Sequence, residues 1–464
     1  MNPWEAPGPF QPFSFAAHRI EAALTADPAV EAEVRVIEGR GQSLEGWLAA
    51  VEDFAPDLIG FSAYLWSMPT FVEMARRLKA TNPSRPVIFG GPSARPEVMA
   101  LSPYQGADAW VDALVIKEGE QSICALATTP QADWGGISGI ALSRGGRFVR
   151  TPERAPNADL DGLASPFQLG LAPRGVSAHL ETFRGCPMSC TFCQWGDLGS
   201  RAQVFSLESL TAELRAFKAA EATGVYLVDA GLNLNSRAFR NFAEAEAEVG
   251  FVRDTELVCE VYPSLLKPEH LDFLESTDAT VGLGLQSTNT ELLRAHERPF
   301  QLGRFDQVVE ALASVAKTTI EIIVGLPGDS PEGFRRTLEQ VLALPVSVRV
   351  YHCLVLPDAL LTRAPARYAM DFDPVTLEMR SCLGWTEAAL KAETDRLTAM
   401  VAERNGLFTT VWPLPHQESP RVLGRPLGTP LWMFPNRAHE DYHRRGRRAL
   451  GEAVMPGKPS SPRR

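Results

Sequence analysis

The chain lacks the features that would assign it to a membrane, a secretory or a nucleic-acid-binding class. It has no uninterrupted apolar stretch long enough to cross a bilayer. Its N-terminus, MNPWEAPGPFQPF, has no basic stretch followed by an apolar run, so it is not a secretory signal. The formal net charge is −11 at pH 7, whereas a nucleic-acid groove needs a basic face. These absences predict a cytoplasmic protein with no membrane and no nucleic-acid partner.

Cysteine is also scarce, and its distribution is uneven. The 464 residues contain 7 cysteines, an odd number, and three of them lie within eight positions, at 186, 190 and 193. This pattern suits a reducing compartment and a metal site better than a disulfide framework. Apolar residues make up 45% of the chain, which is ordinary for a globular protein with sizeable cores.

The first part of the chain, residues 1–150, alternates strand-like and helix-like segments. We expect strands at 33–39, 57–66, 86–92 and 112–120, and helices at 44–54 and 69–81. This alternation predicts an α/β domain of Rossmann-like type with a parallel, doubly wound sheet. No strand precedes residue 33, although such domains usually begin with one. Ligands of these sheets bind at the carboxyl ends of the strands.

A Pro-, Ala- and Asp-rich linker is expected at 151–173, followed by a second αβ series at 174–360. Its six predicted strands are 176–182, 225–229, 257–261, 280–285, 319–324 and 348–355. Ser206 is the expected N-cap of a helix over 207–222, with Gly224 as its stop. Six βα units predict an incomplete (β/α)6 barrel of TIM type, with its active face at the strand carboxyl ends. Residues 361–464 are expected to form a small C-terminal α+β domain, with a helix at 387–404 and a strand at 408–412.

The segment RGCPMSCTFCQWG carries the spacing Cys186-x3-Cys190-x2-Cys193 directly after the first predicted barrel strand. Thiolates are the usual protein ligands of iron–sulfur clusters. Three cysteines hold three irons of a [4Fe–4S] cubane and leave the fourth iron open, as a catalytic metal site requires. The alternatives are a structural zinc site, to which Cys259 and Cys353 would have to contribute, and buried free thiols.

This loop, with Phe192 just before its last cysteine, resembles the radical S-adenosylmethionine (SAM) superfamily. The resemblance implies that SAM chelates the open iron and that reduction of the cluster cleaves a C–S bond of SAM. YLVDAGLNLN, CEVYPSLL, GLGLQST and VGLPGDS are similar to that family's later barrel-strand segments. The SAM contacts that it implies, besides Phe192, are Asp229, Asn233, Glu260, Gln286 and Ser287. Asp229-Ala-Gly231 stands where the family usually has Gly-Gly-Glu.

The N-terminal pattern resembles the cobalamin-binding domain found in front of many radical SAM enzymes. The matching pieces are PDLIGFSAYLW, VIFGGPSA and DALVIKEGE. The implied cobalamin contacts are Ser62, Tyr64, Leu65, Trp66, Gly90, Gly91, Pro92, Glu118, Gly119 and Glu120. The motif Asp-x-His-x2-Gly is absent, so cobalamin would bind without a protein histidine on cobalt, and His18 is expected to be a surface or helix histidine. The alternative is an α/β domain with ordinary glycine turns and no ligand.

Together the two resemblances imply a radical SAM enzyme that uses a [4Fe–4S] cluster, SAM and cobalamin to methylate an unactivated carbon of a small molecule. Its partners would be that substrate and an external electron donor such as flavodoxin or ferredoxin. Rival interpretations keep the cluster but carry out a cyclisation, a rearrangement or an aminocarboxypropyl transfer. A further alternative is a non-catalytic iron–sulfur sensor or scaffold. Trp195, His352, Cys353 and the segment 380–385 are candidates for facing the substrate.

Overall fold

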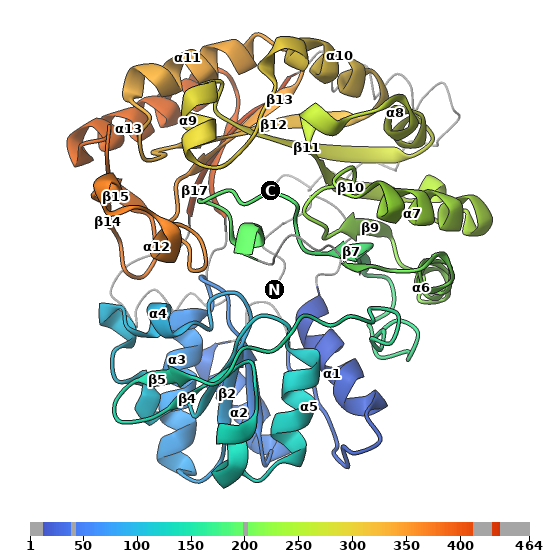
Figure 1. Ribbon diagram of the computed structural model, residues 1–464, viewed down its shortest axis with the longest axis vertical. Coiled ribbons are helices and arrows are strands. Elements are labelled where there is room, and N and C mark those ends of the chain that lie inside the picture. The colour runs from blue at the N-terminus through green and yellow to red at the C-terminus, as the bar shows by residue number, and fades with distance from the viewer. Residues whose placement is uncertain (1–12, 39–42, 198–202, 412–428, 437–464) are drawn as a thin grey trace, which may run out of the picture.

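The computed structural model describes residues 13–38, 43–197, 203–411 and 429–436. Two bodies follow one another along the chain, each built on its own sheet (Figure 1). The first body, blue to cyan, has a five-stranded sheet, and the second, green to orange, has an eight-stranded sheet. This is the α/β architecture that the alternating pattern predicts. No helix within the described ranges is long and apolar enough to cross a membrane.

The N-terminal sheet joins three parallel strands to an antiparallel pair. The strand order is β1 (Ile59–Ser62), β2 (Val87–Gly90), β3 (Ala113–Val115), β4 (Ile140–Ser143) and β5 (Phe148–Arg150). The parallel strands β1 to β3 lie in chain order, so the described sheet lacks the reversal of strand order that defines a doubly wound fold. The expected parallel strands 57–66, 86–92 and 112–120 are present but shorter, and β4 and β5 were not predicted.

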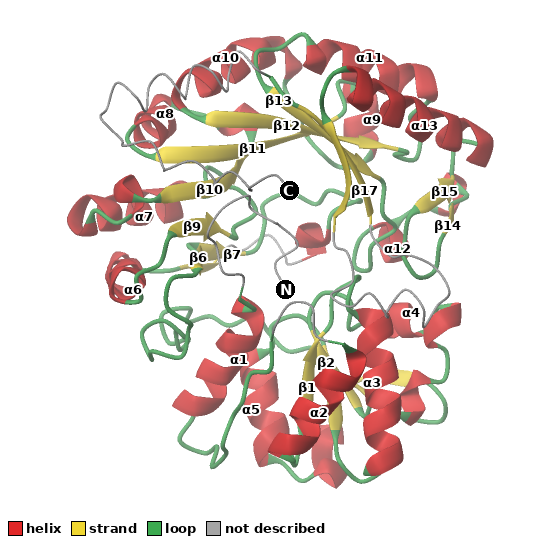
Figure 2. Cartoon of the chain, turned by 180° about the vertical axis from the view of Figure 1, so that it is seen from behind, coloured by secondary structure: helices red, strands yellow, loops and turns green. Residues whose placement is uncertain are grey.

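Helices cover both faces of this sheet and form two separate cores. These helices are α1 (Phe15–Ala26), α2 (Leu44–Phe54), α3 (Met68–Thr81), α4 (Pro96–Met99) and α5 (Glu120–Thr128). One core holds apolar side chains of α2 and α3, and the other holds those of α5 with α1 against it. Figure 2 shows this helical packing around β1 and β2.

The strand expected at 33–39 is wrong over its described residues, 33–38, which have no regular structure. Glu38 accepts a hydrogen bond from the backbone N–H of Ser14, at 2.5 Å, and its carboxylate also contacts His18 at 3.2 Å. The segment is therefore bound to the start of α1 by side-chain contacts. A strand requires a hydrogen-bonding neighbour, and β1 pairs only with β2 among the described strands.

The second body contains the six predicted parallel strands in chain order. They are β6 (Ser177–Leu180), β9 (Gly224–Leu227), β10 (Glu256–Val261), β11 (Asp278–Gln286), β12 (Lys317–Val324) and β13 (Ser347–His352). The covering helices are α6 (Leu207–Ala219), α7 (Ser236–Val249), α8 (Pro268–Glu275), α9 (Thr290–Ala295), α10 (Phe305–Val315) and α11 (Pro331–Leu342). Ser206 caps α6 as predicted, but α6 ends at Ala219 and Gly224 opens β9. The strands curve beneath the helices as an open (β/α)6 barrel (Figure 2).

The segment expected as a separate C-terminal domain is joined to the barrel sheet. It comprises α12 (Leu360–Arg363), β14 (Asp371–Phe372), β15 (Met379–Ser381), α13 (Glu387–Glu403), β16 (Leu407–Val411) and β17 (Thr429–Phe434). Strand β17 pairs antiparallel with β13, and β16 pairs with β17. Trp432 is buried in the same core as the barrel strands, so this segment extends the barrel.

Candidate active site

The cysteine loop follows a short hairpin strand, β7 (Phe183–Arg184), which pairs with β8 (Gln203–Val204). Cys190 is buried, and Cys186 and Cys193 are half-buried. Burial raises the pKa of the Cys186 and Cys193 thiols, and the nearby Cys190 raises it further. Within the described residues, no three or more His, Cys, Asp or Glu side chains converge on a single metal ion, whereas a [4Fe–4S] cluster takes one thiolate on each iron.

Arg363 at the end of α12 holds the backbone of the cysteine loop. Its guanidinium donates to the carbonyls of Ser189 at 3.2 Å, Cys190 at 2.8 Å and Cys193 at 2.7 Å. Three carbonyls directed at one cation fix the curvature of the loop, because the guanidinium fork is planar and rigid. The loop conformation is thus set by a residue far along the chain.

A second anchor lies on the other side of the loop. The hydroxyl of Thr191 contacts Nδ1 of His296 at 2.7 Å, and Nε2 of His296 contacts the carbonyl of Pro327 at 2.8 Å. Phe192 packs edge-on against the same imidazole, with ring centroids 5.6 Å apart. Burial lowers the pKa of His296, so the ring is neutral and acts as a hydrogen-bonding spacer. Phe192 therefore packs against the histidine that supports the loop.

The chemistry of the three thiols fits a cluster. Burial raises the pKa of the Cys193 thiol to about 11, so without a metal this sulfur is protonated at neutral pH. A coordinated metal deprotonates a thiol outright. The guanidinium of Arg298 lies 3.6 Å from the sulfur of Cys190 and supplies positive charge beside it. Three thiols with one buried, two half-buried and a guanidinium beside them suit the negative charge of a thiolate-bound cluster.

Asp229 lies at the carboxyl end of β9 but points at the backbone of the cysteine segment. Its carboxylate accepts hydrogen bonds from the backbone N–H and hydroxyl of Thr182, the N–H at 2.9 Å, and from the N–H of Phe183 at 3.4 Å. Burial raises the pKa of Asp229 to about 7, and the hydrogen bonds from Thr182 and Phe183 oppose that rise. Both carboxylate oxygens accept hydrogen bonds from the chain itself, so the structure gives Asp229 the role of positioning the segment that enters the cysteine loop.

The side chains of Asn233 and Ser287 likewise form hydrogen bonds with other parts of the chain. The amide of Asn233 forms two hydrogen bonds with the backbone of Tyr262, each 2.8 Å long. The hydroxyl of Ser287 accepts from the backbone N–H of Asn289 at 3.1 Å and lies 3.4 Å from the Thr337 hydroxyl. These two expected SAM contacts therefore stabilise the loops that follow β9 and β11.

Glu260 faces the interior of the barrel. It lies opposite Gly282 in the β10–β11 register, and a side chain on Gly282 would collide with its carboxylate. Burial raises the pKa of Glu260 well above its ordinary value, and the nearby Glu321 raises it further. Gln286 ends β11 at a register shift with a φ of 72°, a left-handed conformation. The structure brings Glu260 and Gln286 to the same face of β11, where Glu260 lies against Gly282 and Gln286 against Gly284.

Three residues that the sequence reasoning missed line the same interior. Tyr351 donates its hydroxyl to Glu321 at 3.1 Å, and Arg349 donates to the same carboxylate at 3.4 Å. Glu321 and Arg349 are direct neighbours in the β12–β13 register. Their positions at every second residue of a strand were the signal that could have identified them.

The substrate-facing candidates at the end of β13 point away from this interior. Nε2 of His352 contacts the carbonyl of Met379 at 2.7 Å, and Cys353 is buried in the apolar core. Trp195 is 39% exposed beside the cysteine loop. The segment 380–385 comprises the end of β15 and a turn that lies against the loop after β12, where the carbonyl of Leu383 accepts from the N–H of Gly328 at 2.7 Å.

In the N-terminal body, the loop after β1 carries an aromatic pair. Tyr64 and Trp66 stack with ring centroids 4.6 Å apart, with Leu65 between them in the chain. Burial raises the pKa of Tyr64, and its hydrogen bond with Ser62 opposes that rise. A flat aromatic surface at the carboxyl end of β1 suits a planar macrocycle.

The loop after β2 comes next to it. Gly91 has a φ of 95°, and a Cβ atom there would lie 2.8 Å from the carbonyl oxygen of Ala63, so backbone packing alone requires glycine. A Cβ on Gly90 would meet only Val115, at 3.8 Å. The carbonyl of Pro92 accepts a hydrogen bond from Gln194 of the cysteine loop at 3.3 Å. The two loops that the sequence assigned to different cofactors are in direct contact.

The loop after β3 contacts the cysteine segment as well. Arg184 pairs with Glu118 at 3.4 Å and with Glu120 at 2.5 Å. A Cβ on Gly119 would lie 3.1 Å from Ile20 of α1. The structure therefore places Glu118 and Glu120 in the junction between the two bodies, whereas Gly119 packs against α1 within the first body.

His18, expected on the surface or on a helix, lies on α1 and is buried. It contacts Glu21 at 2.7 Å and Glu38 at 3.2 Å. Burial disfavours the charged ring, but the hydrogen bonds to the two glutamates outweigh it and raise the pKa of His18. The residue fixes the segment that ends at Glu38 to α1.

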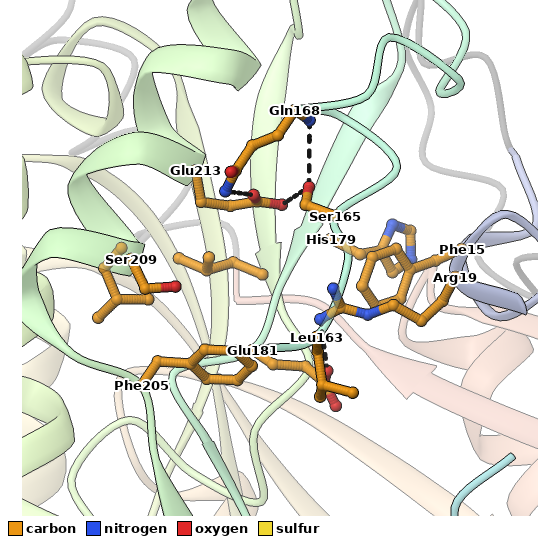
Figure 3. A pocket seen from close by; sticks show the side chains of 12 residues that line it. Phe15, Arg19, Leu163, Ser165, Gln168, His179, Glu181, Phe205, Ser209 and Glu213 are labelled. Atoms are coloured by element: carbon orange, nitrogen blue, oxygen red, sulfur yellow. Dashed lines mark hydrogen bonds and ion pairs between the residues drawn. The ribbon is translucent and has the colours of Figure 1, made fainter. Parts of the chain in front are cut away.

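A small pocket between α1, the linker, β6 and α6 is filled with paired polar groups (Figure 3). The carboxylate of Glu213 accepts from Ser165 and Gln168, both at 2.8 Å. Arg19 of α1 pairs with Glu181 at 3.0 Å, three residues before Arg184. These paired groups make the pocket a polar junction between α1 and the barrel.

Two family models match the chain. The Radical SAM superfamily matches residues 180–341, and the B12 binding domain matches residues 13–127. The chain combines a B12-binding domain with a radical SAM domain. These families imply a [4Fe–4S] cluster, SAM and cobalamin as cofactors. The matched ranges contain the cysteine loop, the barrel strands β9 to β12, and the loops after β1 to β3.

Relatives and solved structures agree with this assignment. The chain is 29% identical to 2-(S-pantetheinyl)-carbapenam-3-carboxylate methyltransferase of Streptantibioticus cattleyicolor, over 66% of this chain and 48% of that protein. It is 27% identical to the cobalamin-dependent radical SAM methyltransferase TokK of Streptomyces tokunonensis, over 66% and 48%. The chain thus spans about half the length of these relatives. The structure of TsrM from Kitasatospora setae, with cobalamin and a [4Fe–4S] cluster bound, matches its fold with a TM-score of 0.58 and 18% identity over 77% of this chain and 72% of TsrM.

Proposed function

We propose that this protein is a cobalamin-dependent radical SAM methyltransferase that methylates an unactivated carbon of a small molecule. The supporting observation is the contact between the two predicted cofactor loops, in which Gln194 donates to the carbonyl of Pro92 at 3.3 Å. A methyl group carried by one cofactor reaches a substrate activated at the other only if the two sites share a cavity. The two relatives named as methyltransferases support the same reaction.

When bound, the cofactors supply reductive cleavage of one SAM to methionine and a 5′-deoxyadenosyl radical, and transfer of a methyl group from a second SAM through cobalamin. The protein supplies position and the exclusion of water. Cys186, Cys190 and Cys193 would hold the cluster. The loops after β1 and β2 would hold the corrin, and Tyr64 and Trp66 would contribute their stacked aromatic surface to that site. Glu260 and Gln286 remain the proposed SAM contacts.

A second candidate is radical cyclisation without methyl transfer. It is favoured by one relative, the anaerobic magnesium-protoporphyrin IX monomethyl ester cyclase of Rubrivivax gelatinosus, which is 25% identical over 61% of this chain and 53% of that protein. The two candidates differ in the products that they form from SAM. Methylation yields S-adenosylhomocysteine together with 5′-deoxyadenosine, whereas cyclisation yields no S-adenosylhomocysteine.

We place the reaction in the cytoplasm, with an external electron donor such as flavodoxin or ferredoxin. All seven cysteines are free thiols, which suits a reducing compartment. The experiment that tests the proposal is anaerobic reconstitution with iron, sulfide and cobalamin, followed by quantification of both SAM-derived products. Formation of S-adenosylhomocysteine only in the presence of cobalamin is the expected result, and its complete absence would overturn the methyltransferase proposal.

A further inference from the structure

The segment after β13 contacts both cofactor loops. Asp358 lies in this segment, and α12 begins two residues later and ends at Arg363. Asp358 has a φ of 56°, a conformation that non-glycine residues seldom adopt. A strained residue persists only where the surrounding structure determines it.

Arg95 connects Asp358 to the loop after β2. Its Nε donates to the carboxylate of Asp358 at 2.5 Å, and its Nη1 donates to the carbonyls of Gly91 and Ala94, both at 3.1 Å. Arg95 is only 6% exposed. One buried guanidinium therefore fixes the shape of the Gly91 loop and joins it to the barrel body.

Arg363 continues this connection to the cysteine loop. It lies five residues after Asp358 and donates to the carbonyls of Cys190 and Cys193. Gln194 then returns to Pro92, so the contacts form a closed ring through the two loops and α12. A displacement at Asp358 must move Arg363 or distort one helical turn.

We propose that Arg95 and Asp358 are positioning residues that set the separation between cobalamin and the iron–sulfur cluster. This inference rests on the proposed function. Two arginines with planar, rigid guanidinium groups act at the two ends of the segment 358–363. Arg95 joins its first residue, Asp358, to the Gly91 loop, and Arg363, its last residue, holds the cysteine loop. Misplacement of reacting groups by about 1 Å can cost roughly 100-fold in rate, so a fixed separation has a direct chemical consequence.

A purely stabilising role makes different predictions from a positioning role. A stabilising ion pair affects the unfolding temperature and leaves the geometry of the folded protein unchanged. A positioning pair affects the distance between the two cofactors even in fully folded protein. The distance is accessible because cob(II)alamin and the reduced cluster are both paramagnetic, so pulsed electron paramagnetic resonance (EPR) measures it directly.

The test uses full-length protein reconstituted with iron, sulfide and hydroxocobalamin, then partially reduced. Asp358→Asn keeps the size of the side chain and tolerates the positive φ, but removes the charge. Asp358→Gly removes the side chain without backbone strain and provides a second variant if the first retains a neutral hydrogen bond. Glu97→Gln is the matched control, because it removes an exposed carboxylate that pairs with Arg150 at 2.7 Å in the same body.

We expect a broader and longer cobalt–cluster distance distribution in Asp358→Gly, a smaller change in Asp358→Asn and none in Glu97→Gln. With SAM alone, the ratio of 5′-deoxyadenosine to S-adenosylhomocysteine should rise roughly 10- to 100-fold in Asp358→Gly. An unchanged distance in both Asp358 variants, at full cluster and corrinoid content, would overturn the inference and leave the proposed function standing. A wild-type protein that binds no corrinoid would instead refute the proposed function, and this inference with it.

Discussion

Replacement of Asp229 by alanine tests whether this carboxylate supports the cysteine segment or contacts SAM. The variant removes the acceptor of the Thr182 N–H, at 2.9 Å, and of the Thr182 hydroxyl. Asp229 is 5% exposed and Thr182 is 3% exposed, so bulk water does not reach these donors. Each buried donor left without a partner costs about 1–3 kcal/mol, which gives about 2–6 kcal/mol for the two together. This is a large part of the free energy of unfolding of a typical domain.

The assay compares the unfolding temperature, the iron content after reconstitution and the affinity for SAM. Asp229→Ala should lose stability and cluster together, because the segment that enters the loop is no longer held. Asp229→Asn should retain most of both, since one oxygen still accepts and the threonine hydroxyl can rotate to accept from the amide. An alanine variant with normal stability and iron content but weakened SAM binding would refute the supporting role and restore the SAM contact.

Asp229 also affects the pH dependence of stability. Burial raises its folded-state pKa to about 7, whereas an unfolded aspartate titrates near about 3.9. The native state therefore holds this proton more tightly, and the stabilising contribution is complete below about pH 3.9 and is lost as the pH rises through about 7. Unfolding of the metal-free chain between pH 5 and 8 should show a smaller decline in Asp229→Asn than in the wild type. Equal slopes would contradict the shifted pKa.

Three further outcomes test the site. Cys190→Ala should abolish the iron–sulfur absorption. Cys382→Ala should retain it, because the wild-type Cys382 thiol donates to the Gly325 carbonyl at 3.6 Å. Equal loss of absorption in both variants would exclude the three-cysteine site. Arg298→Gln should shift the cluster midpoint to a more negative value in an EPR redox titration, because it removes the positive charge 3.6 Å from the Cys190 sulfur, and an unchanged midpoint would contradict this role. Gly90→Ala should lower the corrinoid content at an unchanged unfolding temperature, and full corrinoid binding would show that the loop lies away from the ligand.

The barrel strands and the cysteine loop could be predicted because their signals are local. Each barrel strand is a short apolar run followed by an amphipathic helix, and this repeat depends only on neighbouring residues. The spacing of the three cysteines is likewise contained in eight positions. The comparisons confirm the families that these local patterns indicated.

The roles of individual polar residues could not be predicted in this way. Asp229 follows barrel strand β9 and Glu260 lies on β10, and only the folded chain shows that the carboxylate of Asp229 accepts hydrogen bonds from Thr182 whereas Glu260 faces the interior. The pairing of Arg95 with Asp358 spans 263 positions, so no sequence window contains it. Strand β17 joins β13 for the same reason, because antiparallel pairing depends on a distant partner.

The most direct test of the account follows the methyl group of SAM. Protein reconstituted anaerobically with iron, sulfide and cobalamin is reduced in the presence of SAM that carries a deuterated methyl group, and the corrinoid and nucleoside products are analysed by mass spectrometry. We expect a labelled methyl group on the corrinoid, S-adenosylhomocysteine in matching amount, and 5′-deoxyadenosine. In Cys190→Ala we expect all three to be lost while the corrinoid itself stays bound. Abundant 5′-deoxyadenosine with no labelled corrinoid and no S-adenosylhomocysteine, at full cofactor content, would contradict a cobalamin-dependent methyl transfer.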